Sequence, residues 1–205
     1  MVSAGITRGF GLLENFLSLR RMKIAQKLIE KHGKSGSILD IGCGSYPLLL
    51  INSNFNEKYG IDQAIIDTKL KHLNISLIKH DIHLDGKLPF QNDYFDVITM
   101  LAVIEHLEYN QIYNLLKECY SKLKKDGILI ITTPAKWSNY PLNLMAKLYL
   151  VSPEEIKEHK NAFTLSELNL VLLKANFKES NIQKGYFEFF LNLWICAKKL
   201  VFKKF

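Results

Sequence analysis

The sequence predicts an α/β fold in which a doubly wound sheet of seven strands, mostly parallel, is covered by helices on both faces. The first observation behind this is an alternation. Between residues 37 and 133, short apolar segments rich in β-branched residues alternate with segments whose apolar residues recur every three or four positions. The second is that the last two apolar segments follow one another directly, as antiparallel strands do. At 205 residues the chain is long enough for one well-buried core, so we expect a single domain over residues 1–205.

The order of elements follows from these patterns. Apolar spacing predicts helix over residues 1–34, ended by His32-Gly33-Lys34, because a basic residue and a glycine suit a helix C-terminus. A second helix is predicted over Gln111–Leu123, followed by a turn at Lys125-Asp126-Gly127. The predicted strands of this part are Ser37–Ile41, Tyr59–Asp62, Ile75–His80, Phe95–Leu101 and Ile128–Thr133, the last of them ended by Pro134.

Residues 135–163 break the alternation. The segment is longer than a simple connection, and long connections in compact domains are commonly functional lids. Its aromatic residues could close on a planar or apolar substrate, or form a small satellite core; they are Trp137, Tyr140, Tyr149 and Phe163. The rest of the chain predicts a helix over Phe163–Asn176, with Thr164 or Ser166 as its N-cap, and two antiparallel strands. These strands are Phe177–Gln183 and Tyr186–Ala197, joined through Lys184-Gly185.

Composition narrows the class of protein. A hydrophobic content of 48% is that of a globular chain, and a net charge of +7 could favour nucleic acid or an anionic membrane, although the lysines are scattered as on a solvated surface. Three well-separated cysteines suggest reduced thiols and a cytoplasmic protein. No secretory signal is apparent, and the apolar stretch Phe189–Ala197 is too short to span a bilayer. The basic tail Lys198–Phe205 could touch a membrane surface, or simply fray.

The turn Asp40-Ile41-Gly42-Cys43-Gly44 is the first candidate for a binding site. It follows a predicted strand, and its glycines would let backbone N–H groups approach an anionic or nucleotide ligand closely. The dinucleotide fingerprint needs a third glycine at position 47, where this chain has Pro47. That substitution disfavours a nicotinamide cofactor, and Pro47 is expected instead in the first turn of a helix.

Two aspartates follow the next strands. Asp62, at the end of the second strand, could accept hydrogen bonds from both hydroxyls of a ribose, and Asp81, after the third, could accept from an adenine amine. The alternative for each is structural: a capping or surface aspartate for Asp62 and a turn aspartate for Asp81.

In this order the motifs resemble those of class I S-adenosylmethionine (SAM)-dependent methyltransferases, in particular the small-molecule branch that includes ubiquinone-type O-methyltransferases. The resemblance implies a Rossmann-like sheet, SAM as cofactor and S-adenosylhomocysteine as product. It is carried by Ile38–Gly44, Gly60–Asp62, His80–Ile82, Leu88–Phe90, Asp93–Ile98, Val103–Leu107, Leu123–Ile130, and His159 with Phe163-Thr164 and Leu168. Tyr46 and Pro47 depart from the family, which has small residues after the second glycine.

The resemblance also assigns roles to residues. The backbone of residues 41–44 would face the methionyl part of SAM, and Asp40 would anchor the turn or reach the cofactor amine. Asp62, with Gln63 beside it, would hold the ribose. Asp81 and Ile82 would contact the adenine, while Leu101 and Ala102 would lie beside the sulfonium.

The expected reaction is methyl transfer to a small-molecule acceptor, most simply a hydroxyl, by in-line displacement. His106 and His159 are the candidate general bases, since a neutral imidazole is available near physiological pH. Glu105 could be a metal ligand, but without a convincing second ligand we expect no metal. Two alternatives stay open: an RNA methyltransferase, suggested by the charge, and a non-catalytic nucleoside-binding protein, suggested by Tyr46-Pro47. A monomer or a homodimer is expected.

Overall fold

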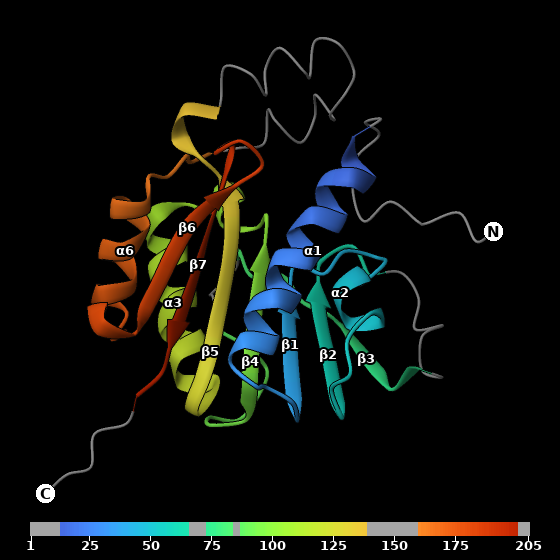
Figure 1. Ribbon diagram of the computed structural model, residues 1–205. Helices are drawn as coiled ribbons and strands as arrows, with labels where there is room; N and C mark the ends of the chain where they lie inside the picture. Colours follow the sequence, from blue (N-terminus) through green and yellow to red (C-terminus); the bar gives the residue numbers. More distant parts are fainter. Residues whose placement is uncertain (1–12, 66–72, 84–86, 139–159, 201–205) are drawn as a thin grey trace, which may run out of the picture.

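The computed structural model describes residues 13–65, 73–83, 87–138 and 160–200 (Figure 1). Its centre is a seven-stranded sheet in the order β3-β2-β1-β4-β5-β7-β6, in which β1 to β5 are parallel and β7 is antiparallel to both β5 and β6. This confirms the predicted fold class. The strands are β1 (Ser37–Ile41), β2 (Glu57–Asp62), β3 (Ile75–Lys79), β4 (Phe95–Leu101), β5 (Leu123–Pro134), β6 (Ile182–Phe187) and β7 (Asn192–Lys198).

Helices cover both faces of the sheet. α1 and α2 lie on the face seen in front in Figure 1, and α3 and α6 lie on the other. The α-helices are α1 (Glu14–Lys31), α2 (Leu48–Ile51), α3 (Tyr109–Lys122) and α6 (Leu165–Lys174), and the 3₁₀ turns are η2 (Ile104–His106), η3 (Lys136–Ser138) and η4 (Glu179–Asn181). None of the helices in the described ranges is long and apolar enough to cross a membrane.

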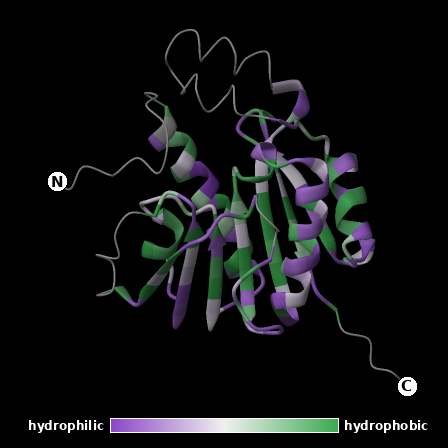
Figure 2. Ribbon diagram, turned by 180° about the vertical axis from the view of Figure 1, so that it is seen from behind, coloured by the Kyte–Doolittle hydropathy of each residue, from purple (hydrophilic) through white to green (hydrophobic). Residues whose placement is uncertain are grey.

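Two apolar clusters result from the alternation of side chains along the buried strands. In β1, Ile38 packs toward α1 and α2, whereas its neighbour Leu39 packs toward α3. Successive residues of a strand point to opposite faces, so β1 and the second half of β5, in which consecutive residues are all buried, must be covered on both sides. Figure 2 shows much of the middle of the sheet in green, while purple lies mainly on the helices and towards the strand ends.

The start of α6 follows the sequence closely. Thr164 is the N-cap: its hydroxyl accepts the Glu167 N–H at 3.2 Å, and the Glu167 carboxylate accepts the Thr164 N–H at 2.8 Å. This reciprocal pair is a capping box, which satisfies backbone donors that the first helical turn leaves open. Of the two candidate caps, Thr164 is therefore the one used.

The turn expected at residues 125–127 is the irregular beginning of β5 instead. The strand starts at Leu123, and its pairing with β4 shifts register between Phe95 and Val97. Asp126 adopts a left-handed φ of 63°, and its N–H donates to the Lys199 carbonyl at 2.9 Å. Residues 125–127, which the local sequence predicts as a turn, are therefore part of a strand, because Asp126 pairs with Lys199 after β7.

The connection between the last two strands lies elsewhere than expected. Lys184-Gly185 is inside β6, and the turn is formed by residues 188–191. Glu188, Phe189 and Phe190 adopt left-handed φ values of 52°, 54° and 68°. Non-glycine residues rarely adopt this conformation, so the sequence of residues 188–191 did not predict a turn. Gly185 stays in the strand because the Trp194 ring covers it: a Cβ there would lie 2.9 Å from that ring.

Candidate functional site

The glycine-rich turn lies directly after β1, at the edge of the sheet where the parallel strands end, called here the carboxyl edge. Gly42 and Gly44 have φ values of 71° and 68°, and a Cβ on Gly42 would lie 2.5 Å from Cγ2 of Val103. The Gly42 N–H donates to the Ile61 carbonyl of β2 at 2.8 Å. The turn is therefore pressed between the ends of β2 and β4, and only glycine suits its first left-handed position.

Asp62 connects this turn to the end of β2. Its Oδ2 accepts the Gly44 N–H at 2.9 Å, and its Oδ1 accepts the Ala64 N–H at 2.8 Å. The residue is only 3% exposed, while the neighbouring Gln63 is exposed. The structure thus brings the first and second cofactor motifs together. Each carboxylate oxygen has a second lone pair, so these bonds are compatible with further acceptance from a ribose hydroxyl.

Asp40 lies inside the sheet, one residue before the end of β1. Its Oδ1 accepts the Thr99 hydroxyl at 2.6 Å from the neighbouring strand β4. Burial raises the pKa of this carboxyl to about 7; the Thr99 hydrogen bond opposes the rise, and the charge of Asp62 adds to it. This geometry suits an anchor beneath the turn, the first of the two roles expected for Asp40.

The adenine-contacting candidates Asp81 and Ile82 follow β3. Asp81 Oδ1 accepts the His83 N–H at 2.9 Å, which is the bond of an Asx turn, and Ile82 packs against the larger apolar cluster. The His83 carbonyl accepts from the Gln111 amide of α3 at 2.8 Å. Asp81 therefore shapes the loop after β3, as expected of a turn aspartate. The contact of Asp81 and Ile82 with adenine stays a prediction.

The end of β4 completes the cofactor side. Leu101 is the last residue of the strand and is half-buried. Ala102 has a left-handed φ of 58°, and its N–H donates to the Thr132 carbonyl of β5 at 2.9 Å. A non-glycine residue in this conformation costs about 1–2 kcal/mol, and such strain is common where backbone is shaped for a ligand. Nothing in the sequence marks Ala102 as left-handed.

Glu105 and His106 form η2, which follows β4. The Glu105 side chain is 1% exposed and accepts the Thr133 hydroxyl of β5 at 3.0 Å. Its carbonyl accepts the N–H groups of Lys160 and Asn161 at 2.8 and 3.1 Å. His106 is half-buried on the same turn. Glu105 thus fixes the point at which the chain returns from the expected lid.

The other end of the expected lid is also fastened. Ala135 forms a parallel bridge with Phe163, and the Lys136 N–H donates to the Phe163 carbonyl at 2.9 Å. Trp137 is exposed just beyond this bridge, in η3. The two ends of the segment therefore lie together at the carboxyl edge. His159, Tyr140 and Tyr149 lie outside the described residues.

One expectation about the helix after the turn needs correction. Pro47 is the N-cap residue of α2, with φ −77° and ψ 77°, and does not lie in its first turn. α2 has only four residues, because Asn52 ends it and the chain turns into β2. A helix this short adds little dipole, so the backbone N–H groups of the turn itself are the relevant donors.

Other possible sites are few. Within the described ranges, no three or more His, Cys, Asp or Glu side chains are grouped as metal ligands would be. The three cysteines are free and buried. A hollow of about 370 Å³ lies at the opposite edge of the sheet, at the starts of β2 and β3, and none of the predicted site residues lines it; its lining is Asn56–Tyr59 and Asn74–Ser76.

Solved structures similar in fold to this chain include methyltransferases. A SAM-dependent methyltransferase from Archaeoglobus fulgidus has a TM-score of 0.64 at 19% identity, covering 89% of this chain and 94% of that one. The Haloferax volcanii complex between the Trm112 methyltransferase activator and a methyltransferase gives a TM-score of 0.67 at 13% identity, covering 91% and 93%. Phosphoethanolamine N-methyltransferase 2 from Haemonchus contortus, in complex with SAM, has a TM-score of 0.62 at 14% identity. The match covers 87% of this chain and 53% of that one.

These likenesses establish the fold class, a Rossmann-like sheet of the kind that class I methyltransferases use. No curated protein matches the chain by sequence. A family model described as a methyltransferase domain matches residues 14–181, which is most of the chain. The chain belongs to this family. It is a class I methyltransferase with SAM as its cofactor, as the motifs predicted.

Two residues that bond to buried carboxylates of the candidate site were missed by sequence analysis: Thr99 and Thr133. Both threonines lie in strongly apolar strands, where a threonine is easily interpreted as one more β-branched residue that suits a strand. Their importance depends on register, because Asp40 lies opposite Thr99 only once β1 and β4 are paired.

Proposed function

We propose that this enzyme transfers the methyl group of SAM to a hydroxyl oxygen of a small molecule, at the carboxyl edge of the sheet. The observation that carries the proposal is the bond from the Gly44 N–H to Asp62, since it joins two separate motifs into one binding surface. The backbone of residues 41–44 would hold the methionyl part, Asp62 and Gln63 the ribose, Asp81 and Ile82 the adenine, and Leu101 would lie beside the sulfonium.

SAM supplies an electrophilic methyl group, so the chain has little covalent chemistry to perform. Its main contribution is to hold the acceptor oxygen in line with that methyl group, which in favourable intramolecular systems is equivalent to about 7–11 kcal/mol. His106 would accept the hydroxyl proton, and His159 is the second candidate base. Glu105 would act through the backbone, by keeping η2 and the returning chain in place.

The acceptor would be enclosed by a lid over residues 135–163 of a single domain. The fastening of both lid ends supports this, since a long segment anchored at two neighbouring points can close over a site. Within the methyltransferase family, the Glu105-His106 pair favours the small-molecule branch. The three buried, reduced cysteines favour a cytoplasmic location.

Calorimetry with SAM and S-adenosylhomocysteine tests the cofactor site. Asp62→Ala should weaken both by about tenfold to a hundredfold, because hydrogen bonds to a charged group contribute about 1.5–3 kcal/mol. Asp96→Ala is the matched control: Asp96 also accepts a backbone N–H, from Ser37 at 2.9 Å, but lies at the opposite edge of the sheet. Equal affinities for the Asp62 and Asp96 variants would remove Asp62 from the site.

Transfer of labelled methyl from SAM to acceptors in a cell extract tests the base. His106→Gln should lower kcat by about 10²–10⁴-fold, since a positioned base contributes that much, and leave SAM affinity unchanged. If His106→Gln transfers at the normal rate while His159→Gln does not, His159 is the base.

An RNA acceptor is the second candidate, favoured by the +7 charge and by the basic outer face of α1. It predicts that methyl label enters the RNA fraction, and that binding to RNA weakens steeply as salt is raised. Label confined to small organic molecules would dismiss it.

A further inference from the structure

The turn between β6 and β7 exposes two aromatic side chains. Phe189 is 93% exposed and Phe190 is 65% exposed, and the Phe190 ring lies 5.8 Å from that of Tyr186. Three consecutive left-handed residues form this turn, at a cost of about 1–2 kcal/mol each. A conformation so costly, which directs phenylalanine into solvent, points to an apolar environment outside the chain.

The turn is held in place from both sides. The Leu191 N–H donates to the Glu188 carbonyl at 3.0 Å, and the Asn192 amide donates to the Glu188 carboxylate at 2.6 Å. Arg20 of α1 lies 3.9 Å from the same carboxylate. These contacts fix the position of the two phenylalanines relative to the first half of α1.

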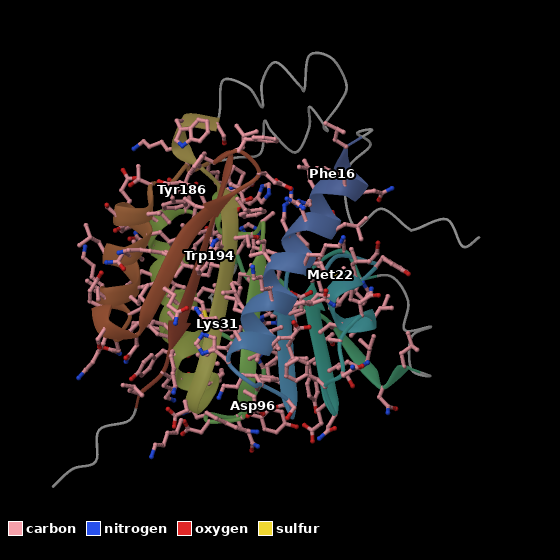
Figure 3. All side chains as sticks on the ribbon, viewed as in Figure 1. Phe16, Met22, Lys31, Asp96, Tyr186 and Trp194 are labelled. Atoms are coloured by element: carbon pink, nitrogen blue, oxygen red, sulfur yellow. The ribbon has the colours of Figure 1, made fainter. Side chains whose placement is uncertain are left out.

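The neighbouring part of α1 is also apolar on its outside. Phe16 is 54% exposed, Leu19 is exposed one turn away, and Figure 3 shows Phe16 at the upper end of the helix. Further along, the exposed charged side chains described on α1 are cationic except for Glu30; they are Arg20, Lys23, Lys27 and Lys31. We call Phe16, Leu19, these four cations, Phe189 and Phe190 the α1–hairpin surface.

The hairpin end of this surface adjoins the carboxyl edge, whereas Lys31 lies at the far end of α1, where it donates to Gln183 at the start of β6 at 2.8 Å. Asn192 pairs with Pro134 at the end of β5, and the Leu191 carbonyl accepts the Ala135 N–H at 2.9 Å. The turn therefore touches the first residue of the expected lid. Lys199, which follows β7, lies by contrast at the opposite edge, where it pairs with Asp93.

We propose that the α1–hairpin surface docks the carboxyl edge on an anionic lipid bilayer, so that the enzyme takes its acceptor, an amphipathic or lipid-linked hydroxyl compound, from the membrane interface. The identity of the acceptor rests on the proposed function; the docking does not. Aromatic side chains insert at the level of the headgroups, and each nearby Lys or Arg adds attraction to anionic lipid.

The chemistry of the surface favours lipid over a protein partner. A stable protein interface buries about 800 Å² on each side in a closely packed patch. Here the apolar side chains are few and project outward, and they are followed by a row of cations instead of a polar rim of both signs. Projecting aromatics combined with positive charge match a bilayer with anionic headgroups.

The test is sedimentation of the full chain with vesicles of phosphatidylcholine alone and with an equal part of phosphatidylglycerol. We expect binding to the anionic vesicles only, weakened by salt. Phe189→Asn with Phe190→Asn should reduce binding about tenfold or more, because burying a phenylalanine contributes strongly. Asparagine tolerates the left-handed backbone, so the turn is preserved. Leu170→Gln is the control, since Leu170 is 57% exposed on α6, away from the surface.

The charge is tested separately. Lys23→Gln with Lys27→Gln should lower binding roughly fivefold per lysine. Lys117→Gln with Lys174→Gln removes two exposed lysines of α3 and α6 and should have no effect. Calorimetry with SAM should give the same affinity for all these variants, so loss of docking and loss of the cofactor site are distinguished.

Several results would overturn the docking. These are absence of binding to anionic vesicles, full binding by the Phe189/Phe190 variant, or loss of binding only on deletion of residues 201–205. A change of oligomeric state in the phenylalanine variant, with vesicle binding unaltered, would assign the surface to a second copy of the chain. Lysine variants that lose RNA binding but keep vesicle binding would assign α1 to nucleic acid.

Discussion

The two sides of the carboxyl edge are built differently. On the proposed cofactor side, at the ends of β1, β2 and β4, carboxylates are buried and hydrogen-bonded: Asp40 to Thr99 of β4, and Asp62 to Gly44 of the turn after β1. On the proposed acceptor side, around η2, η3 and the β6–β7 turn, one buried carboxylate, Glu105, is bonded to Thr133. Backbone bonds such as Lys136 to Phe163 hold the rest of the chain there, and Trp137, Phe189 and Phe190 are exposed.

The difference reflects what each side must do. A cofactor of fixed shape is best held by groups that are already in position, so burial and short hydrogen bonds are an advantage there. An acceptor must enter and a product must leave, which requires segments that open at low cost in free energy. We therefore expect substitutions on the first side to affect SAM binding and stability together, and substitutions on the second to affect turnover.

Gly42→Ala should show the largest effect on the cofactor side. The left-handed φ costs about 1–2 kcal/mol, and a Cβ placed 2.5 Å from Val103 adds about 1–3 kcal/mol of overpacking. The expected result is loss of SAM binding by calorimetry and a lower free energy of unfolding. Gly33→Ala is the control, because Gly33 is also left-handed but has nothing within 4 Å of the added carbon. Normal SAM affinity for Gly42→Ala would mean that the turn adapts and is not a fixed cradle.

Asp40 predicts a pH dependence of stability without SAM. Its pKa is about 7 in the fold and near 3.8 in the unfolded chain, so between these values the folded state binds the extra proton. The contribution of this carboxyl to stability is therefore greatest below about pH 4. It is lost as the pH rises through about 7, by about 4 kcal/mol in total.

Urea unfolding of the wild type and of Asp40→Asn at pH 5 and pH 8 measures this contribution. The neutral amide can still accept from Thr99 but cannot ionise, so the difference in unfolding free energy between the two proteins should change with pH. Parallel curves would show that Asp40 is ionised in the fold and that its burial is less costly than the geometry indicates.

Thr133→Val tests the acceptor side and should have the smallest effect on stability. It leaves Glu105 without the hydroxyl at 3.0 Å and should cost about 1–3 kcal/mol. Because Glu105 also holds Lys160 and Asn161 through its carbonyl, kcat should fall while SAM affinity is kept. Thr99→Val is the matched variant on the cofactor side, and it should weaken SAM binding instead. Equal effects of both variants on SAM binding would remove the distinction between the two sides.

Much of the fold was readable from local patterns. β4 has the predicted bounds, and α6 begins at its capping box, because apolar periodicity and capping act within a few residues. The β6–β7 turn was misplaced because its position depends on contacts between strands: Trp194 covers Gly185, and the left-handed residues 188–190 are held by Asn192 and α1.

The sequence alone determined the family, the order of the strands along the chain, and the residues of the glycine-rich turn with Asp62 and Asp81. These are local features, since a tight turn with left-handed backbone needs glycine, and apolar periodicity marks a strand or helix within a few residues. Only the tertiary structure decided what those residues bind within the protein. Thr99 reaches Asp40, Gly44 reaches Asp62, and Glu105 holds Lys160, because parallel pairing places positions far apart in sequence on neighbouring strand ends.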